Sequence, residues 1–554
     1  MAKSSAPAAT GGPIQGVLLP TNLDQYFVPH KTIRIAVSGD VQLTKLECDI
    51  VDTSDFQRLR FIRQLGTAYL VYPTAVHTRF DHSLGTLAVA AIMVRAIQEN
   101  RHNDDAERSI PQEDEALIRL VALLHDICHI PFGHTIEDEF AILTRHDSNT
   151  SRFDRFLGID SSIGQLIVNR FGEAFYRRFA KIYQTERRDA ATLGEDAYIY
   201  DLVNNTACAD LLDYLRRDSY FCGIMLDMEY RFLKYLYLYQ DDGARRVAIR
   251  LWKKREGKPR PDILSELVRL LDNRYLLSER VYFHHARLIS GAMLADAVLR
   301  EKLAGRLNED KLCEIGDDQL VQLLVNSPDL IVRKLGSAVK NRTLWKEFYQ
   351  RDYSRISSEQ SEHRDMSIAD LTINLWWADP EQKQRSADFV AQCLGMEAGD
   401  LIIYCPPEGM NRKIAEMKVF WNGALRNLDA CTDHPVIALR LKTILDSHEM
   451  LWAIRAYSAP NLNHTWENGR VAMDMLLTFD ERIQRSAGAE FYSAVVARIA
   501  AKEKLDLIPH TEYARCAESA IDRLMSQTAE TRTASSVEAI IKNAFGMQGK
   551  HSTT

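Results

Sequence analysis

The sequence lacks the features that would mark a membrane-spanning, secreted or zinc-ribbon protein. Its nine cysteines form no CxxC pair, which argues against a zinc ribbon or a disulfide framework. No stretch reaches the roughly eighteen apolar residues that a transmembrane helix needs. The N-terminal MAKSSAPAATGGP also contains no apolar run of signal-peptide length. We therefore expect a cytoplasmic protein with reduced thiols and no membrane partner.

An excess of positive charge is also absent. The 554 residues carry a formal net charge of −7, so the chain offers no basic footprint for a long nucleic acid. We expect a small anionic ligand held by a local cluster of residues. No internal repeat is found, and a chain that is 46% hydrophobic can bury the cores of roughly two to four domains.

Helical periodicity dominates the sequence. Apolar residues of DEALIRLVALLHDICH recur at i, i+3, i+4 and i+7 from Leu117, which is typical of one helix face, and we expect this helix to run to Pro131. Further helices are expected at FDHSLGTLAVAAIMVRAIQEN and at ACADLLDYLRRDSYFCG, the latter ending at Gly223. Strand-like segments are short: RIAVSGDVQL, LIIYCPP and MKVFW. The predicted fold class is mainly α with small β additions.

A cluster of titratable residues lies in LLHDICHIPFGH, residues 123–134. The helical spacing places His125 on the inward face, with Asp126 beside it and His129 one turn later. A buried carboxylate costs several kcal/mol unless it is paired or binds a metal. Imidazole and carboxylate ligands together suit Mn, Fe, Co or Zn. The alternative is a buried polar cluster whose members satisfy one another.

The flanking sequence carries a resemblance to a known family. DTSDFQRLRFIRQLGTAYLVYPTAVHTRFDHSLGT (residues 52–86), followed by HDICHIPFGH, resembles the HD-domain phosphohydrolases, most closely their deoxynucleoside triphosphate triphosphohydrolase branch. The resemblance covers roughly residues 30 to 420 and implies an HD-domain helical bundle with a helical C-terminal region. We expect a disordered tail over 1–25, the HD domain over 26–300, a mainly helical region with a small β element near 401–420 over 301–525, and a flexible tail over 526–554.

The resemblance also implies roles for individual residues. The metal ligands would be His82, His125, Asp126 and Asp210. Next to them, His129 and His134 match positions that line the phosphates, and His146 matches a histidine of proton transfer. Either His129 or His146 could protonate the leaving oxygen, and we favour His146, oriented by its neighbour Asp147.

Substrate recognition follows from the same resemblance. Gln64 and Asp218 would bind the sugar 3′-hydroxyl, while Leu65 and Tyr282 would pack against C2′ and disfavour a ribose. Arg79 and Arg274 would bind phosphate oxygens through charge-assisted hydrogen bonds, together with His134. Tyr214 matches one further position that contacts the substrate.

The chain departs from the family pattern at two places. Leu211 stands where the family usually has a lysine that reaches the triphosphate, and loss of this cation weakens the case for a triphosphate. RIAVSGDVQL replaces a DPIHG-type segment of a nucleotide effector site. Asp52 and Arg60 remain at effector-type positions, although Asp52 could instead cap the helix of DFQRLRF.

Three functions therefore remain open at the level of sequence. The first is metal-dependent hydrolysis of deoxynucleoside triphosphates to deoxynucleoside and tripolyphosphate. The second is hydrolysis of another phosphate ester, such as a nucleoside monophosphate, a cyclic or oligonucleotide diester, or single-stranded nucleic acid. The third is a non-catalytic nucleotide sensor. The expected cofactor is a divalent ion (Mn, Fe, Co, Mg or Zn), and the expected partners are a nucleotide substrate, a nucleotide effector and further copies of the chain in a homo-oligomer.

Overall fold

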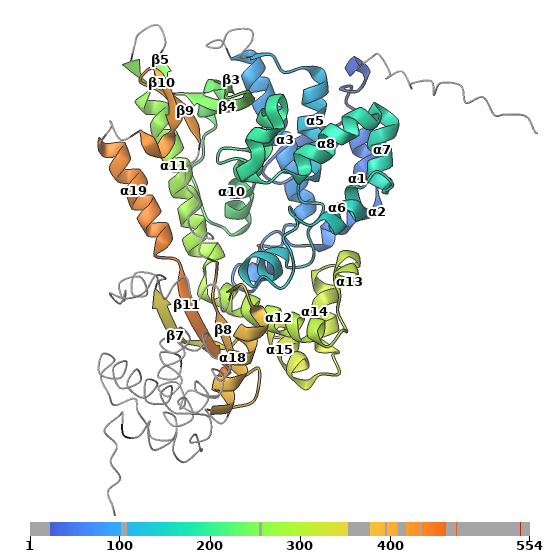
Figure 1. Cartoon of the computed structure of the whole chain (residues 1–554), viewed down its shortest axis with the longest axis vertical. Helices are drawn as coiled ribbons and strands as arrows, with labels where there is room; N and C mark the ends of the chain where they lie inside the picture. The colour runs from blue at the N-terminus through green and yellow to red at the C-terminus, as the bar shows by residue number, and fades with distance from the viewer. Residues whose placement is uncertain are drawn as a thin grey trace, which may run out of the picture.

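The computed structural model describes residues 23–100, 108–253, 258–352, 377–393, 396–407, 417–431 and 435–460, together with the single residues 473 and 543 (Figure 1). Most of the two expected tails, 1–25 and 526–554, therefore lies outside the described residues.

The predicted mainly helical fold is confirmed. The helices up to residue 303 are α1 (Lys45–Val51), α2 (Ser54–Gln57), α3 (Arg79–Glu99), α5 (Gln112–Leu124), α6 (Thr150–Leu157), α7 (Ser162–Phe171), α8 (Glu173–Gln184), α9 (Ala197–Asn204), α10 (Ala209–Phe221), α11 (Pro261–Leu277) and α12 (His285–Leu303). Those that follow are α13 (Glu309–Glu314), α14 (Asp317–Val325), α15 (Leu330–Lys340), α18 (Pro380–Cys393) and α19 (Pro435–Glu449). Short helical turns are η1 (Leu23–Gln25), η2 (Arg58–Phe61), η3 (Gly66–Leu70), η4 (Thr135–Glu139), η5 (Arg187–Asp196), η6 (Arg231–Tyr235), η7 (Ser278–Tyr282) and η10 (Leu428–Ala430).

The strands form small separate sheets. The first is a hairpin of β1 (Lys31–Ile35) and β2 (Gly39–Leu43), with Lys31 opposite Leu43. The expected strand-like segment RIAVSGDVQL thus spans the end of β1, the turn and β2. The second has the order β10-β9-β4-β3, and the third the order β7-β11-β8. Their strands are β3 (Leu236–Asp241), β4 (Ala244–Arg250), β7 (Lys346–Asp352), β8 (Leu401–Tyr404), β9 (Lys418–Trp421), β10 (Ala424–Asn427) and β11 (Ala453–Ser458), and β5 (Trp252–Lys253) pairs with β6 (Lys258–Pro259).

Two of these sheets join segments that are distant in the sequence. β4 pairs in parallel with β9, so that Ile249 lies opposite Val419. β11 is the central strand of its sheet and is antiparallel to both β7 and β8. The expected strands LIIYCPP and MKVFW are β8 and β9, whereas their partners β4, β10 and β11 were not expected from the sequence. Figure 1 places the β7-β11-β8 sheet and α18 in the lower part of the molecule, below α10 and α11.

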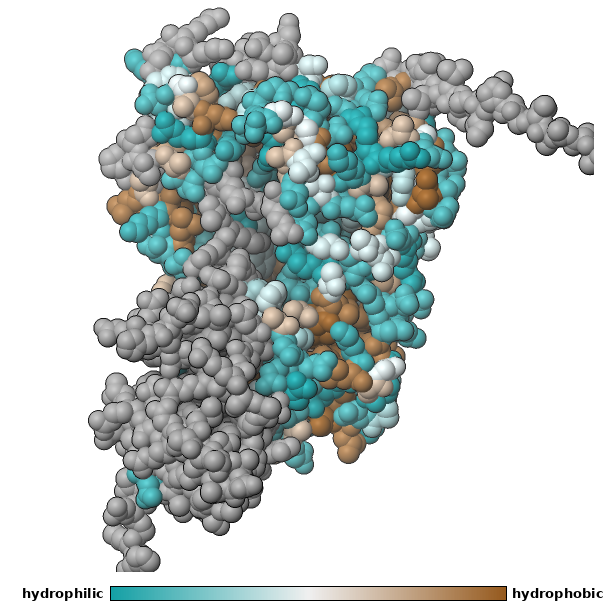
Figure 2. Space-filling view, viewed as in Figure 1, coloured by the Kyte–Doolittle hydropathy of each residue, from teal (hydrophilic) through white to brown (hydrophobic). Residues whose placement is uncertain are grey.

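Helix α3 forms the centre of the helical core, between α5 and α10. Its N-cap Thr78 and Asp81 form a capping box, which fixes the start of the helix. By length and composition α3 could cross a membrane, but 67% of that apolar window is buried within the structure. This burial is the pattern of a core helix, and the residues on the face seen in Figure 2 are largely hydrophilic.

The ends of two helices position the site. Helix α5 ends at Leu124, with His125 as its C-cap, so the expectation that it continues to Pro131 is wrong. Residues 125–134 instead follow a series of tight turns, which bring successive polar side chains to one place. Helix α10 ends as expected, because Gly223 adopts a φ of 68° directly after the C-cap Cys222.

Candidate active site

The four expected metal ligands converge from three elements. His82 lies in the first turn of α3, His125 and Asp126 follow the end of α5, and Asp210 lies in the first turn of α10. Nε2 of His82 is 3.1 Å from Nε2 of His125 and 3.0 Å from Oδ1 of Asp210. Asp126 places its oxygens 3.5 Å from Nε2 of His125 and 3.8 Å from Nε2 of His82. The atoms therefore surround one small volume.

The hydrogen bonds of the two histidines explain why a cation fits there. Nδ1 of His125 is 2.8 Å from the carbonyl oxygen of Ala122, and Nδ1 of His82 is 2.9 Å from Oδ2 of Asp213. Both Nδ1 atoms face acceptors and so carry hydrogens, which leaves lone pairs on the two Nε2 atoms. His82, His125 and Asp126 each offer a ligand atom within 4.8 Å of the others and could hold a divalent metal ion. Oδ1 of Asp210 adjoins this group, at 3.0 Å from Nε2 of His82 and 3.8 Å from Nε2 of His125.

The electrostatics of the cluster favour positive charge. Burial opposes protonation of His82, but its hydrogen bonds to Asp210 and Asp213 outweigh burial and raise its pKa to about 10. A proton and a divalent ion would therefore compete for the lone pair on Nε2 of His82. Burial likewise opposes ionisation of Asp126, but the charges of Arg79 and the neighbouring histidines hold its pKa well below the usual range. Asp126 is therefore an anion that is available to a cation.

Three further histidines lie beside the metal-type cluster. Nε2 of His129 is 3.3 Å from Oδ1 of Asp126, and the His129 ring lies 3.5 Å from the ring of His146 and 4.8 Å from that of His134. Burial and the nearby Arg79 hold the pKa of His129 well below its usual value, so His129 is neutral. His134 is more exposed, and its Nδ1 contacts Asp138 at 2.6 Å.

The carboxylate that orients His146 is Glu137. Oε2 of Glu137 is 3.1 Å from Nδ1 of His146 and accepts a 3.0 Å hydrogen bond from its backbone N–H. Burial opposes protonation of His146, but the hydrogen bond to Glu137 raises its pKa. The expected partner, Asp147, points elsewhere: it is bound by Arg145 and Ser148, and its side chain is 48% exposed. Asp147 was the wrong choice because adjacent residues in an extended turn point in different directions.

The expected sugar-binding residues form a second group. Asp218 accepts a 2.6 Å hydrogen bond from the hydroxyl of Tyr282, and its other oxygen is 2.9 Å from Nε2 of His77. His77 was not expected; it is fully buried and stacks on Phe221. The Tyr214 and Tyr282 rings lie 6.5 Å apart.

Gln64 and Leu65 lie in the turn before η3. Leu65 is 8% exposed, and Oε1 of Gln64 is buried without a hydrogen-bond partner among the described residues. A buried acceptor without a partner is suited to a ligand hydroxyl.

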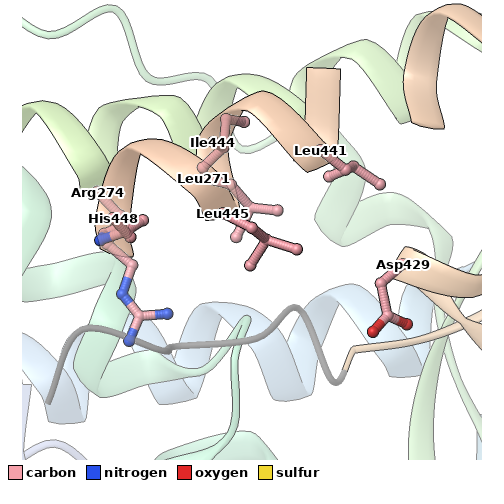
Figure 3. Close-up of a pocket in the computed structure, with 7 residues that line it drawn as sticks. All are labelled: Leu271, Arg274, Asp429, Leu441, Ile444, Leu445 and His448. Atoms are coloured by element: carbon pink, nitrogen blue, oxygen red, sulfur yellow. The ribbon is translucent and has the colours of Figure 1, made fainter. Parts of the chain in front are cut away.

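The two expected phosphate-binding arginines have different surroundings. Arg79 is 2% exposed and places NH1 2.5 Å from Oδ2 of Asp126. Arg274, on α11, is 7% exposed and lines a cavity between α11 and α19. Figure 3 shows its guanidinium at one end of this cavity, with Asp429 at the other. No hydrogen bond joins this guanidinium to the described residues, but its charge acts on Tyr214 by opposing the burial that raises the tyrosine's pKa. Arg274 is thus a buried cation whose charge reaches Tyr214, one of the expected substrate-binding residues.

The positions that depart from the family pattern have clear environments. Leu211 is 3% exposed. Asp52 does not cap α2, because Thr53 is its N-cap and accepts from the Phe56 N–H. Arg60 donates to Gln57 at 2.7 Å and lies 3.5 Å from the ring centroid of Phe80.

A carboxylate from the C-terminal half holds two loops of the site. Asp317, fully buried at the start of α14, accepts from the backbone N–H of Arg63 at 2.9 Å and of Phe132 at 3.2 Å. These two residues lie beside Gln64 and between His129 and His134 respectively. Burial raises the pKa of Asp317 to about 7 against the opposing effect of these hydrogen bonds.

A helical core that gathers two imidazoles and two carboxylates from α3, the end of α5 and α10 is the architecture of an HD-domain protein. Comparisons with known families agree: residues 79–202 match the HD domain, and residues 268–476 match the HD associated region. The chain belongs to the HD-domain phosphohydrolase superfamily and resembles its deoxynucleoside triphosphate triphosphohydrolase branch.

Several curated proteins are similar to this chain. An uncharacterized protein of Methanocaldococcus jannaschii, MJ1154, is 29% identical over 326 residues, 58% of this chain and 60% of that protein. The deoxynucleoside triphosphate triphosphohydrolase SAMHD1 of Bos taurus is 25% identical over 411 residues, 67% of each chain. Its homolog in Dictyostelium discoideum is 28% identical over 333 residues, 57% of this chain and 59% of the homolog. The match thus spans between about three fifths and two thirds of these relatives.

One solved structure shows the same fold. It is a hypothetical protein from Aquifex aeolicus, with a TM-score of 0.54 and 20% sequence identity over 79% of this chain and 98% of that chain.

Proposed function

We propose that the protein hydrolyses deoxynucleoside triphosphates to deoxynucleoside and tripolyphosphate in a metal-dependent reaction. The observation that carries the proposal is the convergence of His82, His125, Asp126 and Asp210 beside the His129–His146 pair. The similarity to proteins named as deoxynucleoside triphosphate triphosphohydrolases supports the choice of substrate.

Each group of residues has a separate task in this reaction. His82, His125, Asp126 and Asp210 would hold the divalent ion, which supplies an activated water and polarises a phosphoryl oxygen when it is bound. His146, kept protonated by Glu137, donates a proton to the leaving 5′-oxygen. His129 stays neutral beside it and directs a hydrogen bond toward the phosphate.

The remaining residues select and orient the nucleotide. Asp218 and Gln64 hydrogen-bond the sugar 3′-hydroxyl, and the Tyr282 ring, fixed by its hydrogen bond to Asp218, packs where a 2′-hydroxyl would lie. Arg274 and Arg79 neutralise the phosphates, with His134 at the more exposed side. Since Arg274 is not engaged by a described carboxylate, a phosphate oxygen gives its buried charge a partner.

One observation favours a second candidate function. Leu211 is apolar and buried at the position where a lysine would contact the triphosphate. A substrate with fewer phosphates, such as a monophosphate or a phosphodiester, needs less positive charge there. Hydrolysis of such an ester by the same metal centre is therefore the alternative.

The test is a product analysis with the full-length chain. The protein is incubated with each of the four dNTPs in Mn²⁺ or Mg²⁺, with and without added GTP as an effector, and the products are separated by ion-exchange chromatography. The proposal predicts equal amounts of deoxynucleoside and tripolyphosphate. Release of orthophosphate or pyrophosphate, or cleavage only of a monophosphate or a diester, would contradict it. The His125→Ala/Asp126→Ala variant is the control for a contaminating phosphatase.

The remaining properties concern the ion and the assembly. The ion is one of Mn, Fe, Co, Mg and Zn, which metal analysis of the purified protein distinguishes. A homo-oligomer and a nucleotide effector are further expectations from the family resemblance of the sequence, and light scattering of the full-length chain with and without GTP tests both.

A further inference from the structure

The tip of the β1–β2 hairpin is attached to α10 by a buried arginine. Arg217 donates from NH1 to the carbonyl oxygen of Ala36 at 3.0 Å and from NH2 to Oγ of Ser38 at 2.9 Å. Its side chain is fully buried. Val37, between the two contacts, has a φ of 71°, and this left-handed conformation lets the residues on either side of it face the same guanidinium.

The same arginine also holds Asp213, one helical turn earlier on α10. Nε of Arg217 donates to Oδ2 of Asp213 and NH2 donates to Oδ1, both at 2.8 Å. Ser38 adds a 3.3 Å hydrogen bond to Oδ1. A carboxylate held in this bidentate way has a fixed plane. Asp213 therefore cannot turn without breaking contacts to both the hairpin and Arg217.

Asp213 in turn fixes a metal-type ligand. Its Oδ2 is 2.9 Å from Nδ1 of His82, and both side chains are 1% exposed. This contact places the hydrogen on Nδ1 and sets the direction of the Nε2 lone pair. The hairpin tip and the metal-type cluster are thus joined through Ser38, Arg217, Asp213 and His82.

Helix α3 leaves room for this connection at Gly85. A Cβ atom at residue 85 would lie 2.1 Å from Oδ1 of Asp213 and 2.2 Å from NH2 of Arg217. Both distances are far below a van der Waals contact. The absence of a side chain in the middle of α3, where glycine costs helix stability, is what allows the Asp213–Arg217 pair to reach His82.

We propose that Ser38 and Arg217 are positioning residues for the metal ligand His82 and act on it through Asp213. The inference rests on the proposed metal site. Groups that orient a metal-bound histidine through its second nitrogen typically change metal affinity by roughly 10- to 100-fold when they are removed. The hairpin, which contributes no ligand of its own, thereby sets how well the site binds its ion.

The test measures metal affinity without any nucleotide. Co²⁺ binding to the full-length protein is followed by calorimetry, and the visible absorption of bound Co²⁺ reports ligand geometry. We expect Asp213→Asn to weaken binding by about 10- to 100-fold, and Ser38→Ala to weaken it several-fold with a changed absorption band. Asp40→Asn is the matched control, because it removes only the exposed Arg34–Asp40 pair of the same hairpin, and it should bind Co²⁺ like the wild type.

Two outcomes overturn the proposal. If Ser38→Ala and Asp213→Asn fold by circular dichroism and bind Co²⁺ with wild-type affinity and absorption, the connection is only structural. If Asp213→Asn does not fold, the milder Ser38→Ala decides the question in the same way.

A wild-type protein that binds Co²⁺ but releases no tripolyphosphate leaves this inference standing while it overturns the proposed substrate. A wild-type protein that binds no divalent ion removes both.

Discussion

Glu137 and His146 form a buried pair in which Oε2 lies 3.1 Å from Nδ1, although they are nine positions apart in the sequence. Glu137 also contacts Arg152, so its carboxylate has a fixed orientation. The carboxylate contacts Nδ1 of His146, and the face of the His146 ring lies against the His129 ring, with centroids 3.5 Å apart and planes inclined at 31°.

The first prediction concerns this pair. Glu137→Gln keeps the shape of the side chain but removes the charge that stabilises protonated His146, so kcat should fall by about 100-fold or more with a smaller change in KM. Asp147→Asn should remain within a few-fold of wild type, because Asp147 does not contact His146. Steady-state kinetics with a dNTP provide the measurement. The reverse order of the two effects would restore Asp147 as the orienting carboxylate.

The second prediction concerns the ion and stability. A metal present at 100 times its Kd raises the free energy of unfolding by about 2.7 kcal/mol if it binds only the folded state. Thermal denaturation should therefore move to a lower temperature on chelation and return when Mn²⁺ or Co²⁺ is added. The His125→Ala/Asp126→Ala variant should show no metal-dependent shift. Full metal content in this variant would contradict the ligand assignment.

The third prediction concerns the sugar. Wild-type protein should prefer dGTP to GTP, and Tyr282→Ala should narrow that preference because it removes the ring expected at C2′. His77→Phe keeps the stacking on Phe221 but removes the contact to Asp218. It should mainly raise KM for dNTPs and have less effect on 2′,3′-dideoxynucleotides, which lack the 3′-hydroxyl. Equal wild-type rates on dGTP and GTP would argue against this pocket.

The fourth prediction concerns Leu211. Leu211→Lys introduces an ammonium at a position that is 3% exposed, so the variant should be less stable than wild type without nucleotide. If a triphosphate is the substrate, a dNTP should recover most of this loss and KM should fall. Leu212→Lys, next to it and fully buried, should lose stability without such recovery. Denaturation scans with and without a dNTP distinguish the two variants, and an absence of recovery in both favours the alternative substrate class.

The fifth prediction concerns a buried lysine away from the site. Lys383 is 4% exposed, lies 4.4 Å from the ring centroid of Phe140 and has no hydrogen-bond partner for its ammonium among the described residues. The carboxylate whose charge acts on it, Asp296, is bound by Arg300 and Gln384. Burial therefore lowers the pKa of Lys383 to about 8 from 10.5.

The sign of the pH dependence follows from this shift. Between pH 8 and 10.5 the unfolded chain binds more protons at this residue than the folded chain, so its contribution to the free energy of unfolding rises with pH. Below pH 8 the folded protein carries the full penalty, which is about 3 kcal/mol. Lys383→Met should raise stability near pH 7 and flatten the rise above pH 8. Lys302→Met is the control and should lower stability by about 1 kcal/mol, because Lys302 donates to the carbonyl of Ile142. Denaturant titrations from pH 6 to 10 compare the three proteins.

The sequence predicts the core helices well because their apolar periodicity and end signals are local. The end of α10 at Gly223 is an example. Asp213 could also have been found, since it lies three residues after Asp210 and therefore on the same side of α10. Glu137 and His77 were missed because their partners come from distant turns. The early end of α5 was missed because Pro131 is a stronger local signal than the turns that precede it.

The hydrogen bonds of Asp317 have a consequence for how the chain can be divided. The domain boundary expected at 300 would leave the N–H groups of Arg63 and Phe132 without their acceptor. Asp218, Arg274 and Tyr282 likewise lie beyond the HD domain match that ends at residue 202. The two matched regions are therefore joined by a buried hydrogen bond at the site, and we expect them not to be interchangeable separately. An exchange between relatives that moves residues 79–202 alone would transfer His82, His125 and Asp126 without Asp210 and without the scaffold that shapes the loops around them.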